Sequence, residues 1–446
     1  MLSQLTGLLL AAVIEVTTHG AVADDATSDS AAFRSAFAAA SAGDTVHAGC
    51  GVWDLPKIDN LSAVYLNGLN GITFDGDGTC TSLKMAGGTH VGDYHIFYVV
   101  GGSNWTFKDF ACNGNRVNIV DADEQTHCLT INGVAGFTAH DLTLSHAWGD
   151  GIKFIGDSTT MTDVWAYDII MDDNGRSGLA FAGCGNCLVE RITATNISDS
   201  GIDTEPPLPG MIVGFIVRDT YIGPPTSYGA AAFSLSNGNN FEVYNTTIDG
   251  GVHCSGSDSI LLDHVIIRAA GLGGGITALS MNGIDDVVMN RVNIEASGVY
   301  SGITTASVLD SSKPTNWVLS NVKVTVDSGR AFSLDGGGPG VMTLNKIHVR
   351  SSHPSRYAGT GLYASSTIAA PPMTGLLFQD IDITGVQYGI ILAQGFGKAT
   401  MAVTATGNIN LDHVSGFGTF CDHNGGLTFN QSGLVIDANT VTSGCP

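Results

Sequence analysis

The chain has 446 residues and a formal net charge of −23, with 18 Lys and Arg against 41 Asp and Glu. This acidic balance excludes an ordinary nucleic-acid-binding protein, and it argues against a strongly polyanionic ligand unless a local basic groove overrides it. Glycine is abundant, at 59 residues, and only 13% of the residues are charged, which indicates a turn-rich and β-rich chain.

The N-terminal run Leu8–Ile14 is apolar but too short to span a membrane, and Glu15 follows it directly. No Lys or Arg precedes the run, whereas a secretory signal starts with basic residues. We therefore interpret the run as a folded first strand or cap, with a signal peptide as the alternative. Five Asn-x-Ser/Thr sequons indicate secretion only weakly in a chain so rich in Ser and Thr.

One helix is predicted between residues 15 and 52. Asp29 can cap its start, and Phe33, Phe37 and Ala40 recur at the spacing of one helical face. Strand character resumes after this helix, so we expect the helix to cover the open edge of the first strand layer.

From about residue 60 onward one unit repeats, with alternating apolar positions that end in Gly and an apolar residue. The anchoring glycines are 22 to 32 residues apart and stand at positions 151, 178, 201, 229, 251, 275, 302, 329, 361 and 389. Strands at this period, without a recurrent helix, predict a β-solenoid, since a propeller blade needs about 40–45 residues. Residues 1–52 would form an N-terminal strand and cap helix, and residues 53–446 a parallel β-helix with a C-terminal cap.

The stretch Gly201–Pro206 reads as a short strand with two carboxylates on one face. Side chains alternate along a strand, so Asp203 and Glu205 point one way while Ile202 and Thr204 point the other way. Their Cα atoms should lie roughly 6.6 Å apart. Two carboxylates beside a glycosidic bond can act as general acid and as base or nucleophile, and the alternative is that these acids are solvated surface residues.

Stacking the repeats in register places further polar residues near this pair. Lys153, Ala180 and Asp203 should share one outward column, with Asp150 near another as a third catalytic acid. An Asp-Gly pair is also ordinary turn chemistry, so Asp150 could equally be a turn residue. The predicted substrate-binding residues on this wall are Lys153, Arg176, Trp148, His146, His127 and Asp173.

Nine cysteines are irregularly spaced, and Cys184 and Cys187 form the only close pair. No second CxxC or His pair completes a zinc site, so we predict buried or turn thiols there, with a local disulfide or a metal as alternatives. A disulfide between Cys421 and Cys445 could hold the C-terminal end of the chain together. Clustered Asp could bind Ca²⁺, but no loop has the pattern of a known calcium motif, and we predict no metal or other cofactor.

The segment His19–Asp25, followed by Asp29–Phe33, resembles the opening of right-handed parallel β-helix proteins of the pectate-lyase superfamily, although Ala23 and Asp25 stand where the family has Gly. Ile72–Gly78 is similar to the early strand and turn of that family. Three further motifs look like those of its polysaccharide-active bacterial and phage members; they are Glu124–His127, Gly149–Ile152 and Gly201–Pro206. The resemblance implies one right-handed parallel β-helix of roughly a dozen coils.

The resemblance also implies a protein that binds and cleaves a polysaccharide. We favour a glycoside hydrolase that acts on a bacterial surface glycan or a uronic-acid-containing glycan, as in phage tailspike depolymerases. The adjacent Asp-Asp and the Arg-Ile-Lys of polygalacturonases are missing, which argues against galacturonan hydrolysis. A lyase or epimerase that takes a proton from C5 of a uronic acid is one alternative, and a non-catalytic receptor-binding or structural virion protein is another.

The same resemblance suggests a setting for the molecule. It implies a phage tail or an extracellular location, a homotrimer, and phage tail proteins as partners. We predict no nucleic-acid partner and no membrane partner.

Overall fold

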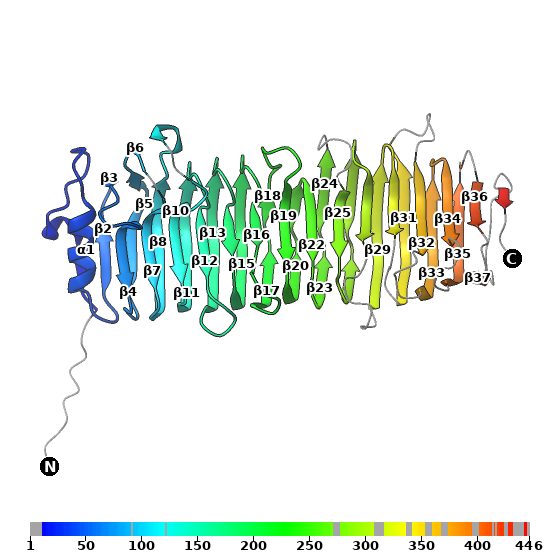
Figure 1. Ribbon diagram of the computed structural model, residues 1–446, viewed down its shortest axis with the longest axis horizontal. Coiled ribbons are helices and arrows are strands. Elements are labelled where there is room, and N and C mark those ends of the chain that lie inside the picture. The colour runs from blue at the N-terminus through cyan, green and yellow to red at the C-terminus, as the bar shows by residue number, and fades with distance from the viewer. Residues whose placement is uncertain are drawn as a thin grey trace, which may run out of the picture. The chain divides into compact units, whose positions relative to one another are not determined.

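The computed structural model describes residues 11–90, 92–120, 123–270, 277–306, 316–335, 341–352, 359–366, 373–394, 401–412, 414, 417–422, 427–430 and 441–443. The chain forms a parallel β-solenoid of about 12 turns (Figure 1), which confirms the predicted fold class. It divides into two compact units, Met1–Leu188 and Val189–Pro446. The predicted division after residue 52 falls inside the first unit and stays a prediction.

Two parallel sheets, here called sheet A and sheet B, form the walls of the first unit. Its sheet A strands are β1 (Val13–Glu15), β2 (Thr45–Ala48), β3 (Gly51–Leu55), β5 (Thr73–Met85), β8 (Ser103–Asn113), β11 (Ala135–Ser145) and β13 (Thr162–Asp172). Its sheet B strands are β4 (Ser62–Asn67), β7 (Tyr94–Val100), β10 (Thr126–Asn132), β12 (Ile152–Ile155) and β14 (Leu179–Phe181). A small separate pair is formed by β6 (Gly88–Thr89) and β9 (Ile119–Val120).

The second unit is built in the same way, and the boundary between the units falls within β15 (Cys184–Thr195). Its other sheet A strands are β17 (Ile212–Arg218), β18 (Tyr221–Ile222), β20 (Gly238–Tyr244), β21 (Thr247–Asp249), β23 (Ser259–Asp263), β24 (Ile266–Ala270), β26 (Asp286–Asn290), β27 (Asn293–Ser297), β29 (Asn316–Val326), β31 (Val341–Ser351), β33 (Met373–Thr384), β35 (Met401–Asp412) and β37 (Leu427–Asn430). Its sheet B strands are β16 (Ile202–Thr204), β19 (Ala231–Ser236), β22 (Gly251–Ser255), β25 (Thr277–Asn282), β28 (Ser301–Ala306), β30 (Arg330–Asp335), β32 (Thr360–Ser366), β34 (Tyr388–Gln394), β36 (Phe417–Asp422) and β38 (Val441–Ser443).

Helix α1 (Ser30–Ala39) closes the first coil, as the sequence predicted. Phe33 and Phe37 are fully buried and contact the rings of Trp53, Phe74 and Phe97. The residue before the helix, Asp29, makes no side-chain capping bond to it. Its carboxylate instead accepts the backbone N–H groups of Val22 and Asp54, and so joins the entering chain to β3. Short 3₁₀ turns stand at η1 (Val16–His19) and η2 (Arg116–Asn118).

The core consists of apolar columns that run from coil to coil. Ile152 pairs with Leu179 and Phe154 pairs with Phe181, as the repeat predicted, and the last two rings stack with centroids 4.5 Å apart. All four side chains are fully buried. Burying each is worth about 1.5–3 kcal/mol, so the columns account for much of the stability of the unit.

The long strands of sheet A bend where one residue adopts a left-handed conformation. In β11 this residue is Asp141, with a φ of 55°, so that Ala139 and Leu142 can both face the core. The register of the strands places Asp109 and Asp168 at the same bend in the neighbouring coils. Asp and Asn tolerate this conformation better than most residues, because their short side chains can bond locally.

Three disulfides join cysteines of the described chain: Cys50–Cys80, Cys112–Cys128 and Cys184–Cys187. The prediction of thiols at Cys184 and Cys187 is therefore wrong. Asn186, which lies between them, adopts a left-handed conformation with a φ of 55°, and the two Cα atoms lie only 6.3 Å apart. Cys254 is a buried free thiol. The proposed link between Cys421 and Cys445 lies outside the described side chains.

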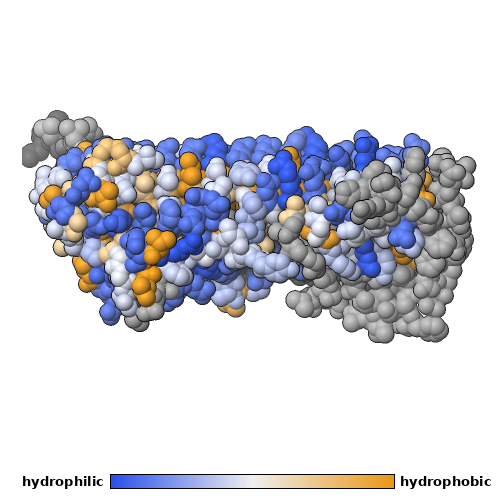
Figure 2. Space-filling model, turned by 90° about the horizontal axis from the view of Figure 1, so that it is seen from above, coloured by the Kyte–Doolittle hydropathy of each residue, from blue (hydrophilic) through white to orange (hydrophobic). Residues whose placement is uncertain are grey.

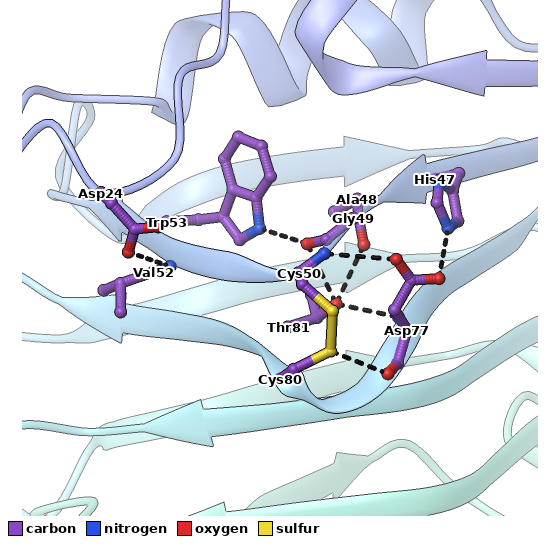
Figure 3. Close-up of a disulfide and its surroundings, with 10 residues drawn as sticks. All are labelled: Asp24, His47, Ala48, Gly49, Cys50, Val52, Trp53, Asp77, Cys80 and Thr81. Atoms are coloured by element: carbon purple, nitrogen blue, oxygen red, sulfur yellow. Dashed lines mark hydrogen bonds and ion pairs between the residues drawn. A yellow bond between two sulfur atoms is a disulfide. The ribbon is translucent and has the colours of Figure 1, made fainter.

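The Cys50–Cys80 disulfide links the turn after β2 to β5 (Figure 3). Asp77 lies beside it and accepts the backbone N–H of Cys50 at 3.2 Å, while its other carboxylate oxygen lies 3.3 Å from Nε2 of His47. Thr81 donates its hydroxyl to the carbonyls of Ala48 and Gly49. The disulfide thus fixes the first full coil beneath the cap helix.

Two histidines lie buried in sheet B of the first unit. His95 pairs in register with His127, and their rings stack with centroids 5.3 Å apart. His127 accepts the backbone N–H of Asp150 through Nδ1 at 2.8 Å, so the proton of the neutral ring is on Nε2. Burial, aided by the charge of Lys153, lowers the pKa of His95 to about 4, and burial also holds the pKa of His127 well below its usual value.

We expect the Cys50→Ser/Cys80→Ser variant to lose about 3 kcal/mol of unfolding free energy, because the crosslink closes a loop of 30 residues in the unfolded chain. Both cysteines are exposed, so serine leaves no cavity. Urea denaturation under oxidising conditions, followed by circular dichroism, measures the change. Cys254→Ala is the control, because that thiol closes no loop. Equal stability of the double variant and the parent would contradict the expectation.

We expect the first unit to lose stability as the pH falls from about 6.5 towards about 4. The unfolded chain binds protons at His95 and His127 in this window while the folded chain keeps both rings neutral, and His95 alone contributes about 3 kcal/mol. Urea titrations at several pH values should show a shallower slope for His95→Gln. His348→Gln, which alters a half-exposed ring, is the control, and a slope unchanged by His95→Gln would refute this account.

Candidate functional site

The acids Asp203 and Glu205 lie at the end of β16 in the second unit, on the outer face of sheet B. Ile202 and Thr204 are buried, whereas Asp203 and Glu205 are both partly exposed, so the structure has the alternation that the sequence predicted. Both acidic residues are therefore partly accessible on the same face. Their catalytic role stays a prediction.

One hydrogen bond and one steric constraint fix the two ends of this strand. The hydroxyl of Thr204 accepts the backbone N–H of Ser236 at 2.6 Å, which ties the end of β16 to β19. At the other end, a side chain on Gly201 would lie only 2.5 Å from Ile222, so the strand can begin there only with glycine. The recurrent glycine of the repeat thus reflects close packing where a sheet B strand starts.

A column of polar side chains continues from Asp203 along the outer face of sheet B. Asp203 pairs with Ser234, which is followed in register by His253, Ser280 and Thr304. A hollow of about 290 Å³ opens beside His253 and Ser280. Burial lowers the pKa of His253, so this imidazole is held neutral. The column offers hydroxyl and imidazole groups at a spacing of about 4.8 Å.

Asp150 occupies a different environment in the first unit, because its side chain is fully buried. One carboxylate oxygen accepts the backbone N–H of Ser177 at 3.0 Å, and the other accepts Nη1 of Arg176 at 3.0 Å and lies 3.4 Å from His127 Nδ1. Asp150 therefore positions the guanidinium of Arg176, which is 13% exposed. His127 is equally buried, so neither residue presents a side chain to solvent.

Three further predicted residues, His146, Trp148 and Asp173, gather around Arg116 of the 3₁₀ turn η2. Arg116 donates to Asp173 Oδ1 at 2.5 Å, and Asp173 Oδ2 lies 3.6 Å from His146 Nε2. Trp148 donates its indole N–H to the carbonyl of Arg116 at 3.1 Å and is 36% exposed. An indole held by its polar edge leaves its ring face available for contact with a sugar.

Lys153 stands in an outward column of sheet B within the first unit. The column runs in register through Tyr65, Tyr98, Thr130, Lys153 and Ala180. The two tyrosine rings meet edge to face, with centroids 5.8 Å apart, and Tyr65 is 39% exposed. Lys153 and Ala180 do share a column, as predicted, but Ala180 is fully buried. This wall combines aromatic faces with an ammonium group.

The sequence reasoning missed Arg116, Tyr65 and Tyr98. Arg116 lies in a short 3₁₀ turn outside the repeat, so no periodic signal marks it. The tyrosines precede the first anchoring glycine of the repeat at position 151, but extending the alternation backwards would have placed both on the wall.

Among the coloured residues of the face in Figure 2, hydrophilic and intermediate residues predominate. Among the described residues, no group of three or more His, Cys, Asp or Glu is arranged to hold a metal ion. Within the same residues, neither the length nor the apolarity of any helix suffices for crossing a bilayer.

No model of a known protein family matches the chain, and a search of curated proteins found no relative. Among solved structures, the chain is similar to the A-module of the mannuronan C-5 epimerase AlgE4 from Azotobacter vinelandii. The TM-score is 0.58 and the identity 16%, over 80% of this chain and 99% of that one.

A second similar structure is the catalytic unit of a thermostable GH87 α-1,3-glucanase from Streptomyces thermodiastaticus strain HF3-3. Its TM-score is 0.51 at 15% identity, over 99% of this chain and 70% of that one. The Dettilon tailspike protein matches with a TM-score of 0.39 at 11% identity, over 95% and 68% of the two chains. At such identities the first two likenesses show a shared architecture, and the chain has the fold of a pectate-lyase-like parallel β-helix.

Proposed function

We propose that the protein cleaves a polysaccharide by hydrolysis on the outer wall of sheet B, with Asp203 and Glu205 as its catalytic acids. The observation that carries this proposal is the alternation at β16, where Asp203 and Glu205 are both partly exposed while Ile202 and Thr204 are buried. A pair of acids on one open face is the arrangement that glycoside hydrolysis requires.

In this mechanism one carboxyl group donates its proton to the glycosidic oxygen as the bond from that oxygen to C1 breaks. The other carboxylate either takes a proton from the water that attacks C1, or attacks C1 itself and is released by water in a second step. The products are two shorter chains, one of which has a new reducing end.

The column from Ser234 to Thr304 supports the binding half of the proposal. Its hydroxyls and the neutral ring of His253 can exchange hydrogen bonds with a polyhydroxylated chain laid along the wall. In the first unit, we assign sugar-ring contact to Trp148, and contact with acidic groups to Lys153 and Arg176. Asp150, buried against Arg176, acts as a positioning residue in this proposal.

The fold likeness makes a polysaccharide a reasonable substrate, since one similar structure is named for an α-1,3-glucanase. The other is named for a mannuronan epimerase, and this favours a second candidate function. Lys153, on the outer wall, could hold the carboxylate of a uronic acid while its C5 proton is removed. Such chemistry would release an unsaturated sugar in a lyase, or invert C5 in an epimerase.

The three disulfides support an oxidising, extracellular setting, because such bonds persist mainly outside the cytosol. A free extracellular protein and a component of a phage tail both meet this condition. The homotrimer and the tail-protein partners stay predictions.

We expect the parent protein to release reducing ends from at least one polysaccharide in a panel of α-1,3-glucan, polymannuronate and bacterial capsules. Asp203→Asn and Glu205→Gln should each lower this rate by about 10²–10⁴-fold, because each removes a proton-transferring or nucleophilic group. Asp286→Asn, which alters an exposed acid on sheet A, is the matched control and should keep the full rate.

Three results would redirect the assignment. Ultraviolet absorbance that rises with the reducing ends would indicate a lyase. Deuterium incorporated at C5 of polymannuronate in heavy water, without new reducing ends, would indicate an epimerase. Binding that survives in both variants, with no product from any polymer, would leave the acids without a catalytic role.

A further inference from the structure

We propose that the second unit carries a binding site for an uncharged saccharide on the outer face of sheet A, separate from the acids of sheet B. A pocket of about 570 Å³ opens there, within the size range of ligand sites. The residues that carry the argument are Arg191, Thr193, Asp219, Tyr221, Asn245 and Arg268, all of which line it.

The backbone builds this pocket from two adjacent columns. Arg191, Asp219 and Asn245 all adopt left-handed conformations at the bend of their strands, with φ values of 52°, 53° and 46°. Next to them, Thr193 pairs with Tyr221, and Tyr221 pairs with Thr247. Successive coils therefore present one polar group each, about 4.8 Å apart, from two neighbouring columns.

Hydrogen bonds hold the polar walls of the pocket in place. Tyr221 donates its hydroxyl to Asp249 Oδ2 at 2.8 Å, and Asp249 Oδ1 accepts Arg268 Nη1 at 3.2 Å. Asn245 donates to Asp219 Oδ1 at 3.2 Å. A pocket whose side chains are already ordered loses little conformational entropy when it binds a ligand.

The arginine at the pocket's other edge is held by a buried acid. Glu190 is 2% exposed and binds both Arg191 and Arg218. Burial alone would raise the pKa of Glu190, but the two guanidinium groups outweigh it and keep that pKa below the usual range. The guanidinium of Arg191, which lines the pocket, is thus held in place by Glu190 and can donate hydrogen bonds there.

The charge balance identifies the class of ligand. Arg191, Arg268 and Asp219 are the charged residues that line the pocket. Each arginine is already paired with a carboxylate behind the lining, Arg191 with Glu190, which also binds Arg218, and Arg268 with Asp249 and Glu295. With these paired carboxylates included, the pocket and its immediate surroundings have no surplus positive charge for an anion. Neighbouring donors and acceptors suit the hydroxyls of a neutral sugar, and the Tyr221 ring can cover its apolar face.

This site would hold a glycan away from the acids of sheet B, so it does not depend on the proposed cleavage. The test uses the full chain carrying Asp203→Asn and Glu205→Gln, in which a bound glycan would not be cut. Isothermal titration with neutral α-1,3-linked and β-1,4-linked glucohexaose is expected to show binding that Tyr221→Ala weakens about tenfold. Asn245→Gly, which keeps the left-handed backbone, should weaken the same binding.

Tyr244→Ala is the matched control, because Tyr244 lies on β20, bonds Glu242 and does not line the pocket. It should leave the affinity unchanged, and circular dichroism should show all variants folded. The proposal is overturned if neither neutral hexasaccharide binds, if Tyr221→Ala and Tyr244→Ala have equal effects, or if hexameric mannuronate binds this pocket more tightly than both neutral chains. Cleavage is tested separately with Tyr221→Ala in a chain that keeps Asp203 and Glu205. This variant should release reducing ends at the same rate as the parent.

Discussion

The left-handed bend in sheet A is the constraint on which the architecture of each unit depends. In a strand that continued straight through the corner of the coil, side chains would keep alternating between the two faces. Apolar side chains beyond the corner would then point outward. One residue with positive φ, such as Asp141, resets the alternation so that Ala139 and Leu142 both face the core. Where coils stack in register, neighbouring strands bend at the same point, as at Asp109, Asp141 and Asp168, and the columns of the core stay aligned across that bend.

The sequence predicted those features that depend on alternation and repeat length. It placed Ile152 opposite Leu179, gave Phe33 and Phe37 to a cap helix, and put Asp203 and Glu205 on one open face. All of these follow from local patterns, because period-two alternation and close stacking leave few other arrangements.

Other features could not be predicted from the sequence, because they depend on contacts between side chains of different coils. The burial of Asp150 requires Arg176, 26 residues later, and the role of Asp173 requires Arg116, 57 residues earlier. The disulfide between Cys184 and Cys187 depends on the exact path of β15, which composition does not specify. Pairing across coils is set by register, and register becomes visible only when the strands are in place.

Several arginines bind buried carboxylates, although the chain has a net charge of −23. Asp150 and Glu190 are both buried, and arginine side chains bind each of them. Several of the scarce cations therefore stabilise carboxylates inside the walls. The outer face of sheet B in the second unit presents mainly hydroxyls after Asp203, a surface suited to sugars rather than to charged polymers.

The bend has a consequence for how such a chain can change over generations. In the second unit the bend is occupied in turn by Arg191, Asp219, Asn245, His264, Arg291, Asn321, Lys346 and Asp380. Acidic, neutral and basic residues all serve, because the position demands a backbone conformation and its side chain points away from the core. Substitutions at this one position in each coil can therefore change the charge along a whole edge of the solenoid without changing the fold.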